Sequence, residues 1–170
     1  MTLRKISVTS GGLTNAAYAT GEVMGNRFAF GSVNDWPNGF GCIRAVSVID
    51  DSATLTGNFE LHLYSAAVVF GTDNNVPTLS DAENKAAFVG IIPFVAATDG
   101  FVLPNQINYT KQNLGIFFVP NAAQVPAVVP PGDGTSLSGY LLTRSTPAGF
   151  PAATNIQIDL LIETGLGFMN

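Results

Sequence analysis

The stretch Phe59–Phe94 constrains the fold of this chain more than any other part of it. Its first six residues, FELHLY, alternate apolar and polar side chains, which is the pattern of a β-strand with one buried face. Ser80 and Glu83 match a capping box, in which the two side chains bond free amides at a helix N-terminus. The apolar run Phe88–Phe94 predicts another strand after about two helical turns. The stretch therefore predicts one short helix, near residues 80–87, that connects two strands.

Six further segments show the alternating or continuous apolar pattern of strands, and none shows the period of a long helix. They are Leu3–Thr9, Glu22–Phe30, Cys42–Ile49, Asn113–Val119, Leu137–Thr143 and Asn155–Glu163. With Phe59–Tyr64 and Phe88–Phe94 they make about eight strands without alternating helices, which favours two packed antiparallel sheets. The sequence predicts an all-β, two-sheet antiparallel sandwich that is jelly-roll-like. An immunoglobulin-like topology remains open, because strand order along the chain does not distinguish the two.

The length of 170 residues predicts a single β-sandwich domain spanning residues 1–170. Only 11% of the residues are charged, while 18 glycines and 10 prolines supply many turns, as in sandwiches and barrels. Two segments, Ala96–Gln112 and the Pro-rich Pro120–Ser136, are predicted to be long loops, which are often functional. The Pro-rich loop is either packed on its own domain or an arm that packs on a neighbouring subunit.

The chain is acidic, with a formal net charge of −5 at pH 7. Because phosphates repel such a chain, we expect no nucleic acid partner. The longest apolar run, Ala86–Ala97, contains Gly90 and Pro93 and is too short to cross a bilayer, so no membrane partner is expected. The basic residues after Met1 are not followed by the apolar segment of a signal peptide, which predicts synthesis in a cytoplasm.

The chain contains few of the residues and motifs that form nucleophilic, metal-binding or phosphate-binding sites. His62 is the only histidine, which excludes a multi-histidine zinc site, and its phase with Glu60 and Tyr64 predicts the exposed face of a strand. Cys42 is the only cysteine and is predicted to be buried. No G-x-S-x-G or P-loop motif occurs, and Arg44 replaces the third glycine of a dinucleotide fingerprint.

The acidic side chains form no predicted site either. Asp50 and Asp51 are adjacent, so they point to opposite faces at a strand end and do not form a catalytic pair. Asp73 and the two asparagines after it are predicted to form a turn, because the rest of a calcium-binding loop is missing. We therefore expect no enzymatic activity, no metal and no cofactor.

Apolar and aromatic side chains outside the predicted core are the candidate interface residues. Asn113–Val119 is apolar on both faces, which predicts that both faces are covered, one of them by something other than the core. The candidates are Trp36 and Phe40 of the loop before Cys42, Phe117 of this strand, and Val125, Val128 and Val129 of the Pro-rich loop.

The order of motifs resembles a family of tailed-phage virion structural proteins. The motifs are YATGEVMG, ELHLYS, the Asp73–Glu83 segment with its helix cap, and FVGII, followed by GYLLTR and TNIQIDLLIE. The resemblance, to jelly-roll capsid decoration (cement) proteins, covers Tyr18–Phe94 and the last two strands. It implies a protein that binds the exterior of a phage head, commonly as a homotrimer, with the major capsid protein as partner. The Pro120–Ser136 segment has no counterpart in that pattern.

A second hypothesis is a carbohydrate-binding β-sandwich, such as a tail or fibre adhesin module. In this hypothesis the aromatic rings of Trp36, Phe40 and Tyr140 stack on sugars. The sequence itself does not decide between the two binding functions.

Overall fold

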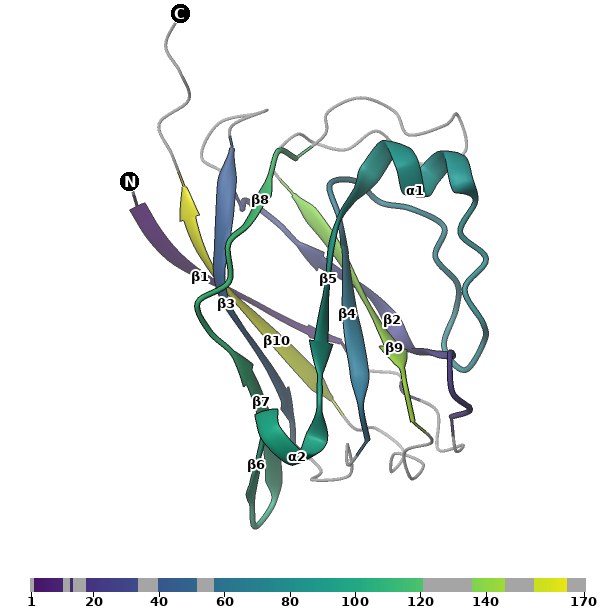
Figure 1. Cartoon of the computed structure of the whole chain (residues 1–170), viewed down its shortest axis with the longest axis vertical. Helices are drawn as coiled ribbons and strands as arrows, with labels where there is room; N and C mark the ends of the chain where they lie inside the picture. Colours follow the sequence, from purple (N-terminus) through teal and green to yellow (C-terminus); the bar gives the residue numbers. More distant parts are fainter. Residues whose placement is uncertain are drawn as a thin grey trace, which may run out of the picture.

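The computed structural model describes residues 2–10, 13, 18–33, 40–51, 57–120, 136–145 and 155–164. Two sheets face one another, with the helix α1 at one end and a β6–β7 hairpin projecting at the other (Figure 1). In chain order the elements are β1 (Thr2–Ser10), β2 (Val23–Phe30), β3 (Gly41–Asp50), β4 (Phe59–Tyr64), α1 (Asp81–Ala87), β5 (Phe88–Phe94), α2 (Ala96–Asp99), β6 (Gly100–Leu103), β7 (Gln106–Lys111), β8 (Ile116–Phe118), β9 (Leu137–Thr143) and β10 (Ile156–Thr164).

The strand order makes the sandwich a jelly roll. One sheet has the order β1-β10-β3-β7-β6, with β8 paired to β3, and the other has the order β2-β9-β4-β5. All pairs are antiparallel. In an immunoglobulin-like sandwich the first two strands would be neighbours in one sheet. Here β1 pairs with β10 and β2 with β9, in different sheets, so the jelly-roll prediction is confirmed.

The main core lies between the two sheets. Each strand turns alternate apolar side chains inward, and these side chains form one buried cluster that includes Phe28, Leu61, Val46 and Ile158. The ring of Phe59 in β4 stacks on that of Phe94 in β5, with centroids 4.9 Å apart. Each large side chain buried here contributes about 1.5–3 kcal/mol of transfer free energy. This packing fixes the positions of the sheet edges.

Most strands occupy the predicted ranges. The predicted loop Ala96–Gln112 is wrong, because it contains α2 and the β6–β7 hairpin, whose turn lies at Pro104 and Asn105. The strand predicted over Asn113–Val119 is shorter than expected, and its paired part is β8. Residues 121–135 of the Pro-rich loop lie outside the described residues.

The predicted helix cap is present at α1. The Glu83 amide donates to Ser80 Oγ at 3.3 Å, and the Ser80 amide donates to Glu83 Oε2 at 3.1 Å. Glu83 also accepts a hydrogen bond from the Val69 amide through Oε1, at 3.1 Å. The carboxylate therefore joins the helix to the loop that precedes it.

That loop, residues 65–79, is called the cover loop here because it lies over the outer face of the four-stranded sheet. Its side chains pack on outward-pointing side chains of the strands in a second cluster that includes Phe70, Tyr64, Tyr140 and Leu142. The prediction that His62 and Tyr64 lie on an exposed face is therefore wrong. His62 is 8% exposed and Tyr64 is 1% exposed.

The predicted turn at Asp73 anchors the cover loop. Asp73 Oδ1 accepts hydrogen bonds from the Tyr18 hydroxyl and the Gly25 amide, both at 2.6 Å. The Asn74 amide donates to the Val23 carbonyl, and Asn74 has a φ of 59°, in the left-handed region that asparagine tolerates. The loop is thus tied to β2 by the side-chain chemistry that the sequence predicted as a turn.

Candidate functional site

The structure places the candidate interface residues in different settings. Phe117 lies in β8 and is 70% exposed, and Phe40 is half-buried just before β3. Trp36, Val125, Val128 and Val129 lie outside the described residues. Of the six candidates, Phe117 is therefore the one that the structure shows on an exposed apolar surface.

The pairing of β8 determines which of its side chains point outward. Phe118 pairs with Gly41 and Phe117 with Cys42, so Phe118 points into the core and Phe117 away from it. A Cβ on Gly41 would come within 2.4 Å of the Phe118 ring, so this glycine makes room for the ring. Val119, the residue after β8, is 53% exposed. Phe117 and Val119 are thus exposed in the single chain, and the predicted cover over this second face of the strand stays a prediction.

The strand β5 adds exposed apolar side chains next to β8. It is an edge strand of the four-stranded sheet, and Phe88 and Ile91 within it are 47% and 42% exposed. A Cβ on Gly90 would lie 3.4 Å from Cγ2 of Ile116, so β5 and β8 are in contact across the gap between the sheets. We call the exposed side chains on and beside these two strands the apolar edge face: Phe88, Ile91, Val95, Phe117 and Val119.

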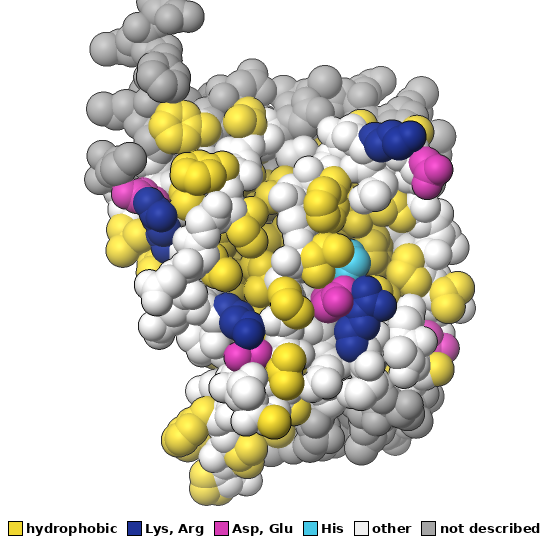
Figure 2. Space-filling model, in the orientation of Figure 1, with side chains coloured by type: hydrophobic (Ala, Val, Ile, Leu, Met, Phe, Trp, Pro, Cys, Tyr) yellow, Lys and Arg dark blue, Asp and Glu magenta, His cyan; other side chains and the backbone are white. Residues whose placement is uncertain are grey.

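The charged side chains around β5 and β8 are joined in ion pairs. Arg44 Nε donates to Glu163 Oε2 at 2.6 Å, which joins β3 to β10. Lys111 Nζ lies 2.8 Å from Asp99 Oδ2, which joins β7 to α2. Figure 2 shows basic and acidic side chains next to one another, with groups of hydrophobic side chains and uncharged polar surface between them. The surface thus offers apolar contact with little net charge.

A third ion pair lies beside the single histidine. Arg144 donates to Glu60 Oε2 at 2.6 Å, and His62 Nε2 lies 2.9 Å from the same oxygen. The hydrogen bond from Arg144 lowers the pKa of Glu60, against the effect of burial. Burial lowers the pKa of His62, and Glu60 offsets this only in part. His62 is therefore neutral at pH 7 and lies in the sheet as a packed, hydrogen-bonded side chain.

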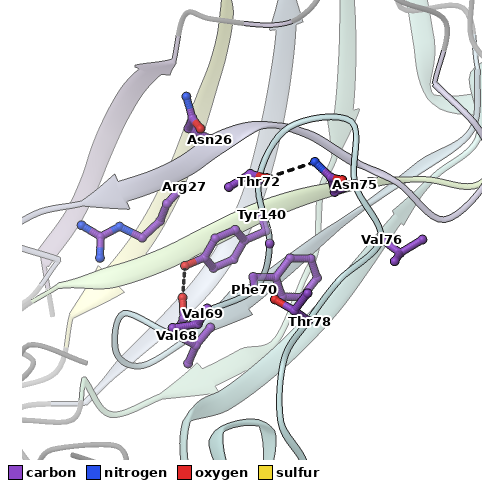
Figure 3. Close-up of a pocket in the computed structure, with 11 residues that line it drawn as sticks. Asn26, Arg27, Val68, Val69, Phe70, Thr72, Asn75, Val76, Thr78 and Tyr140 are labelled. Atoms are coloured by element: carbon purple, nitrogen blue, oxygen red, sulfur yellow. Dashed lines mark hydrogen bonds between the residues drawn. The ribbon is translucent and has the colours of Figure 1, made fainter. Parts of the chain in front are cut away.

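A groove of about 650 Å³ lies between the cover loop and the outer face of β2 and β9. We call it the Arg27 groove; it is lined by Asn26, Arg27, Val68, Val69, Phe70, Gly71, Thr72, Asn75, Val76, Thr78 and Tyr140. Tyr140 and Phe70 lie side by side in its middle, with Arg27 toward one end and Val76 toward the other (Figure 3). Local sequence patterns do not predict this groove, because its shape depends on how the cover loop packs on the sheet. The apolar Val68, Val69 and Phe70, which follow a strand without continuing it, were the available signal.

The stacking role assigned to Tyr140 in the carbohydrate hypothesis does not hold. Tyr140 is 2% exposed, its ring already stacks on Phe70, and its hydroxyl donates to the Val68 carbonyl at 2.6 Å. Burial raises the pKa of Tyr140 to about 12, so the hydroxyl stays protonated. A sugar ring has no access to the aromatic face.

The side chains that most often bind metal ions are not gathered in the described part of the chain. Within residues 2–10, 18–33, 40–51, 57–120, 136–145 and 155–164, no group of three or more His, Cys, Asp or Glu side chains could hold a metal ion. Cys42 is buried, as predicted. Asp50 is buried and Asp51 is exposed, so the two carboxylates do point to opposite sides. No helix of the described residues is both long and apolar enough to cross a membrane.

No family model and no curated protein sequence matches the chain. Among solved structures, the chain is similar to a deletion mutant of the Penaeus vannamei nodavirus capsid protein in a T=1 subviral particle, at 8% identity, a TM-score of 0.41 and coverage of 100% of both chains. It is also similar to the structure of tomato aspermy virus, at 13% identity and a TM-score of 0.31, and the match covers 99% of this chain and 80% of the viral chain. A third similar structure is the empty capsid of Triatoma virus, at 6% identity and a TM-score of 0.36. This match covers 98% of this chain and 71% of the viral chain. Because these TM-scores are low, the jelly-roll assignment rests on the strand order of the chain itself.

Proposed function

We propose that the chain is a structural virion protein that decorates the exterior of a phage head and stabilises it through subunit contacts. In this proposal the apolar edge face binds a second copy of the chain, in a homotrimer, and the assembled protein binds the major capsid protein. The observation that carries the proposal is the exposure of Phe117 and Val119, 70% and 53%, on a strand whose other face is in the core. Exposed apolar side chains gathered on one side of a protein are typical of protein interfaces.

The charge distribution supports association between identical copies. The chain carries a net charge of −5, so two copies repel one another at most orientations. At the apolar edge face the nearby charges are already neutralised by Arg44–Glu163 and Lys111–Asp99. Two copies can therefore approach there with less repulsion. The motif resemblance to capsid decoration proteins supports the same function, with the acidic surface keeping the protein soluble before assembly.

The test combines light scattering with co-sedimentation on phage heads that lack the protein. We expect the unmodified chain to form a closed oligomer and to sediment with the heads. Phe117→Asp should reduce both oligomer formation and sedimentation with the heads, because burying an unpaired carboxylate in the interface is energetically unfavourable. Leu3→Asp is the matched control, since Leu3 is 61% exposed on β1, which β10 and β3 separate from β8. A strict monomer that fails to sediment with heads contradicts the proposal, as does equal loss in both variants.

A further inference from the structure

We propose that the Arg27 groove binds an extended acidic peptide segment of a partner protein, with a carboxylate on Arg27 and separate apolar side chains on Val69 and on Val76. This inference goes beyond the proposed function, because the groove is separate from the apolar edge face and its occupant has a different chemistry. It requires only the folded chain, so its failure leaves the test of the edge face intact.

The charge of the groove is the first argument. Arg27 is one of its lining residues, and no described residue that lines it is acidic. Within the described part of the chain Arg27 has no ion-pair partner, whereas Lys5, Arg44, Lys111 and Arg144 are paired. In a chain with a net charge of −5, a groove with an unpaired guanidinium and no carboxylate is complementary to an anionic ligand.

Two carboxylates close to the groove along the chain, Asp73 and Glu83, already accept hydrogen bonds from other groups. Asp73, in the cover loop, accepts from the Tyr18 hydroxyl and the Gly25 amide. Glu83, in α1, accepts from the Val69 amide and from Ser80. Both carboxylates serve the local structure, so Arg27 stays available to an incoming group.

The form of the groove favours a peptide over a free anion. A single guanidinium matches a carboxylate in bidentate geometry, whereas phosphate sites usually add further cations or a helix N-terminus. Val69 and Val76 are 50% and 63% exposed, and Val76 lies toward the end of the groove away from Arg27 (Figure 3). A segment that spans the groove can therefore pair its carboxylate at one end and bury an apolar side chain at the other.

The groove is held in shape before any ligand binds. Tyr140 and Phe70 are stacked with centroids 4.6 Å apart, and the Tyr140 hydroxyl is bonded to the Val68 carbonyl. Across the loop, Asn75 Nδ2 donates to Thr72 Oγ1 at 3.1 Å. A preformed site loses less conformational entropy on binding, which favours recognition of short segments.

The experiment is an NMR titration of the ¹⁵N-labelled full chain with a blocked Leu-Asp-Leu tripeptide. We expect shifts of the Val69 and Val76 amides and of Arg27 Nε–H, at peptide concentrations up to about 10 mM, the range of a small contact. The isosteric Leu-Asn-Leu peptide should bind about tenfold more weakly, because the charge-assisted bond is lost. Inorganic phosphate and N-acetylneuraminic acid are titrated in parallel.

Variants distinguish the site from general charge attraction. Arg27→Gln should abolish the preference for the aspartate peptide, while Lys85→Gln should retain it, since Lys85 is the other described cation without an ion pair and lies on α1. Equal binding of the two peptides, an unchanged preference in Arg27→Gln, or no shifts at all overturns the proposal. The proposal is also overturned if inorganic phosphate or N-acetylneuraminic acid shifts the same amides as much as the aspartate peptide does.

Discussion

The ring of Tyr140 in β9 stacks on the ring of Phe70 in the cover loop, with centroids 4.6 Å apart and an interplanar angle of 19°. The Tyr140 hydroxyl extends past this contact and donates to the Val68 carbonyl at 2.6 Å. The same side chain therefore holds the cover loop by stacking and by a buried hydrogen bond. This pair is one of the contacts that keep the cover loop on the outer face of the four-stranded sheet.

Two substitutions separate these contributions. Tyr140→Phe keeps the stacked ring and removes the hydroxyl, so it should lower the free energy of unfolding by about 1 kcal/mol. Phe70→Ala removes the ring over the sheet and should lower it by about 3 kcal/mol or more. Both changes are measured by urea denaturation. Equal losses in the two variants would show that the hydrogen bond, and not the packing, dominates.

The close approach of β3 and β8 predicts a strict requirement for glycine at position 41. In Gly41→Ala the new Cβ would lie 2.4 Å from Cζ of the buried Phe118 ring, so the ring or the strand must move. We expect a loss of about 1–3 kcal/mol, the usual cost of overpacking. Gly115→Ala is the control, since a Cβ there meets nothing within 4 Å. Similar stability of the two variants in urea denaturation contradicts this packing argument.

Glu83 should stabilise the fold more than its neighbour Asp81 does, although both lie in the first turn of α1. The Ser80 side chain lowers the pKa of Glu83, and the Val69 and Ser80 amides add to this effect. Glu83→Gln weakens these charge-assisted bonds and should lower the free energy of unfolding by about 1 kcal/mol. Asp81→Asn should lower the free energy of unfolding by only about 0.3 kcal/mol, which is the contribution of an exposed charge near a helix N-terminus. Thermal unfolding of both variants provides the comparison.

The burial of His62 leads us to expect that the folded protein loses stability in mild acid. Burial lowers its pKa in the folded state below the ordinary value of 6.5, so the unfolded chain takes up a proton first as the pH falls. The free energy of unfolding is therefore not reduced by His62 above pH 6.5. Below pH 6.5 the preferential protonation of the unfolded chain reduces it, by at most about 1.4 kcal/mol per pH unit. Because His62 is the only histidine, His62→Gln should flatten the stability profile between pH 6.5 and 4.5. An unchanged profile contradicts the assignment.

Below that range the carboxylates dominate the pH dependence. The pKa of Glu60 is lowered from 4.5, first by the hydrogen bond from Arg144, and the pKa values of Glu83 and Asp159 are lowered as well. Their stabilisation is present above the unfolded pKa values and is lost as the pH falls through the folded ones. The His62→Gln variant should therefore keep its steep loss of stability below about pH 4.5.

Strand positions and the α1 cap could be predicted from local patterns. FELHLY alternates cleanly, and Ser80 and Glu83 have the capping-box spacing, because both features depend on neighbours within a few residues. The β6–β7 hairpin was missed although Ile107 and Tyr109 alternate with polar residues. β6 has only four residues, and its Phe101 and Val102 are exposed, so it lacks the usual buried pattern.

The burial of His62 and the Arg27 groove could not be predicted in the same way. Alternation correctly places His62 on the face of β4 away from the main core, but it does not say whether something else covers that face. The cover comes from Phe70 and its neighbours, held by contacts with Tyr18, Gly25 and Glu83 that are distant in sequence. Such long-range packing has no local signature.

The pairing of β1 with β10 places Thr2 opposite Thr164. A short linker between these two positions would therefore join strands that are already neighbours, without changing the pairing of either sheet. New ends could then be opened at the β6–β7 turn, where Pro104 and Asn105 are exposed. A circular permutation of this kind would connect β1 to β10 and place the new ends on the projecting hairpin, away from both sheets' cores.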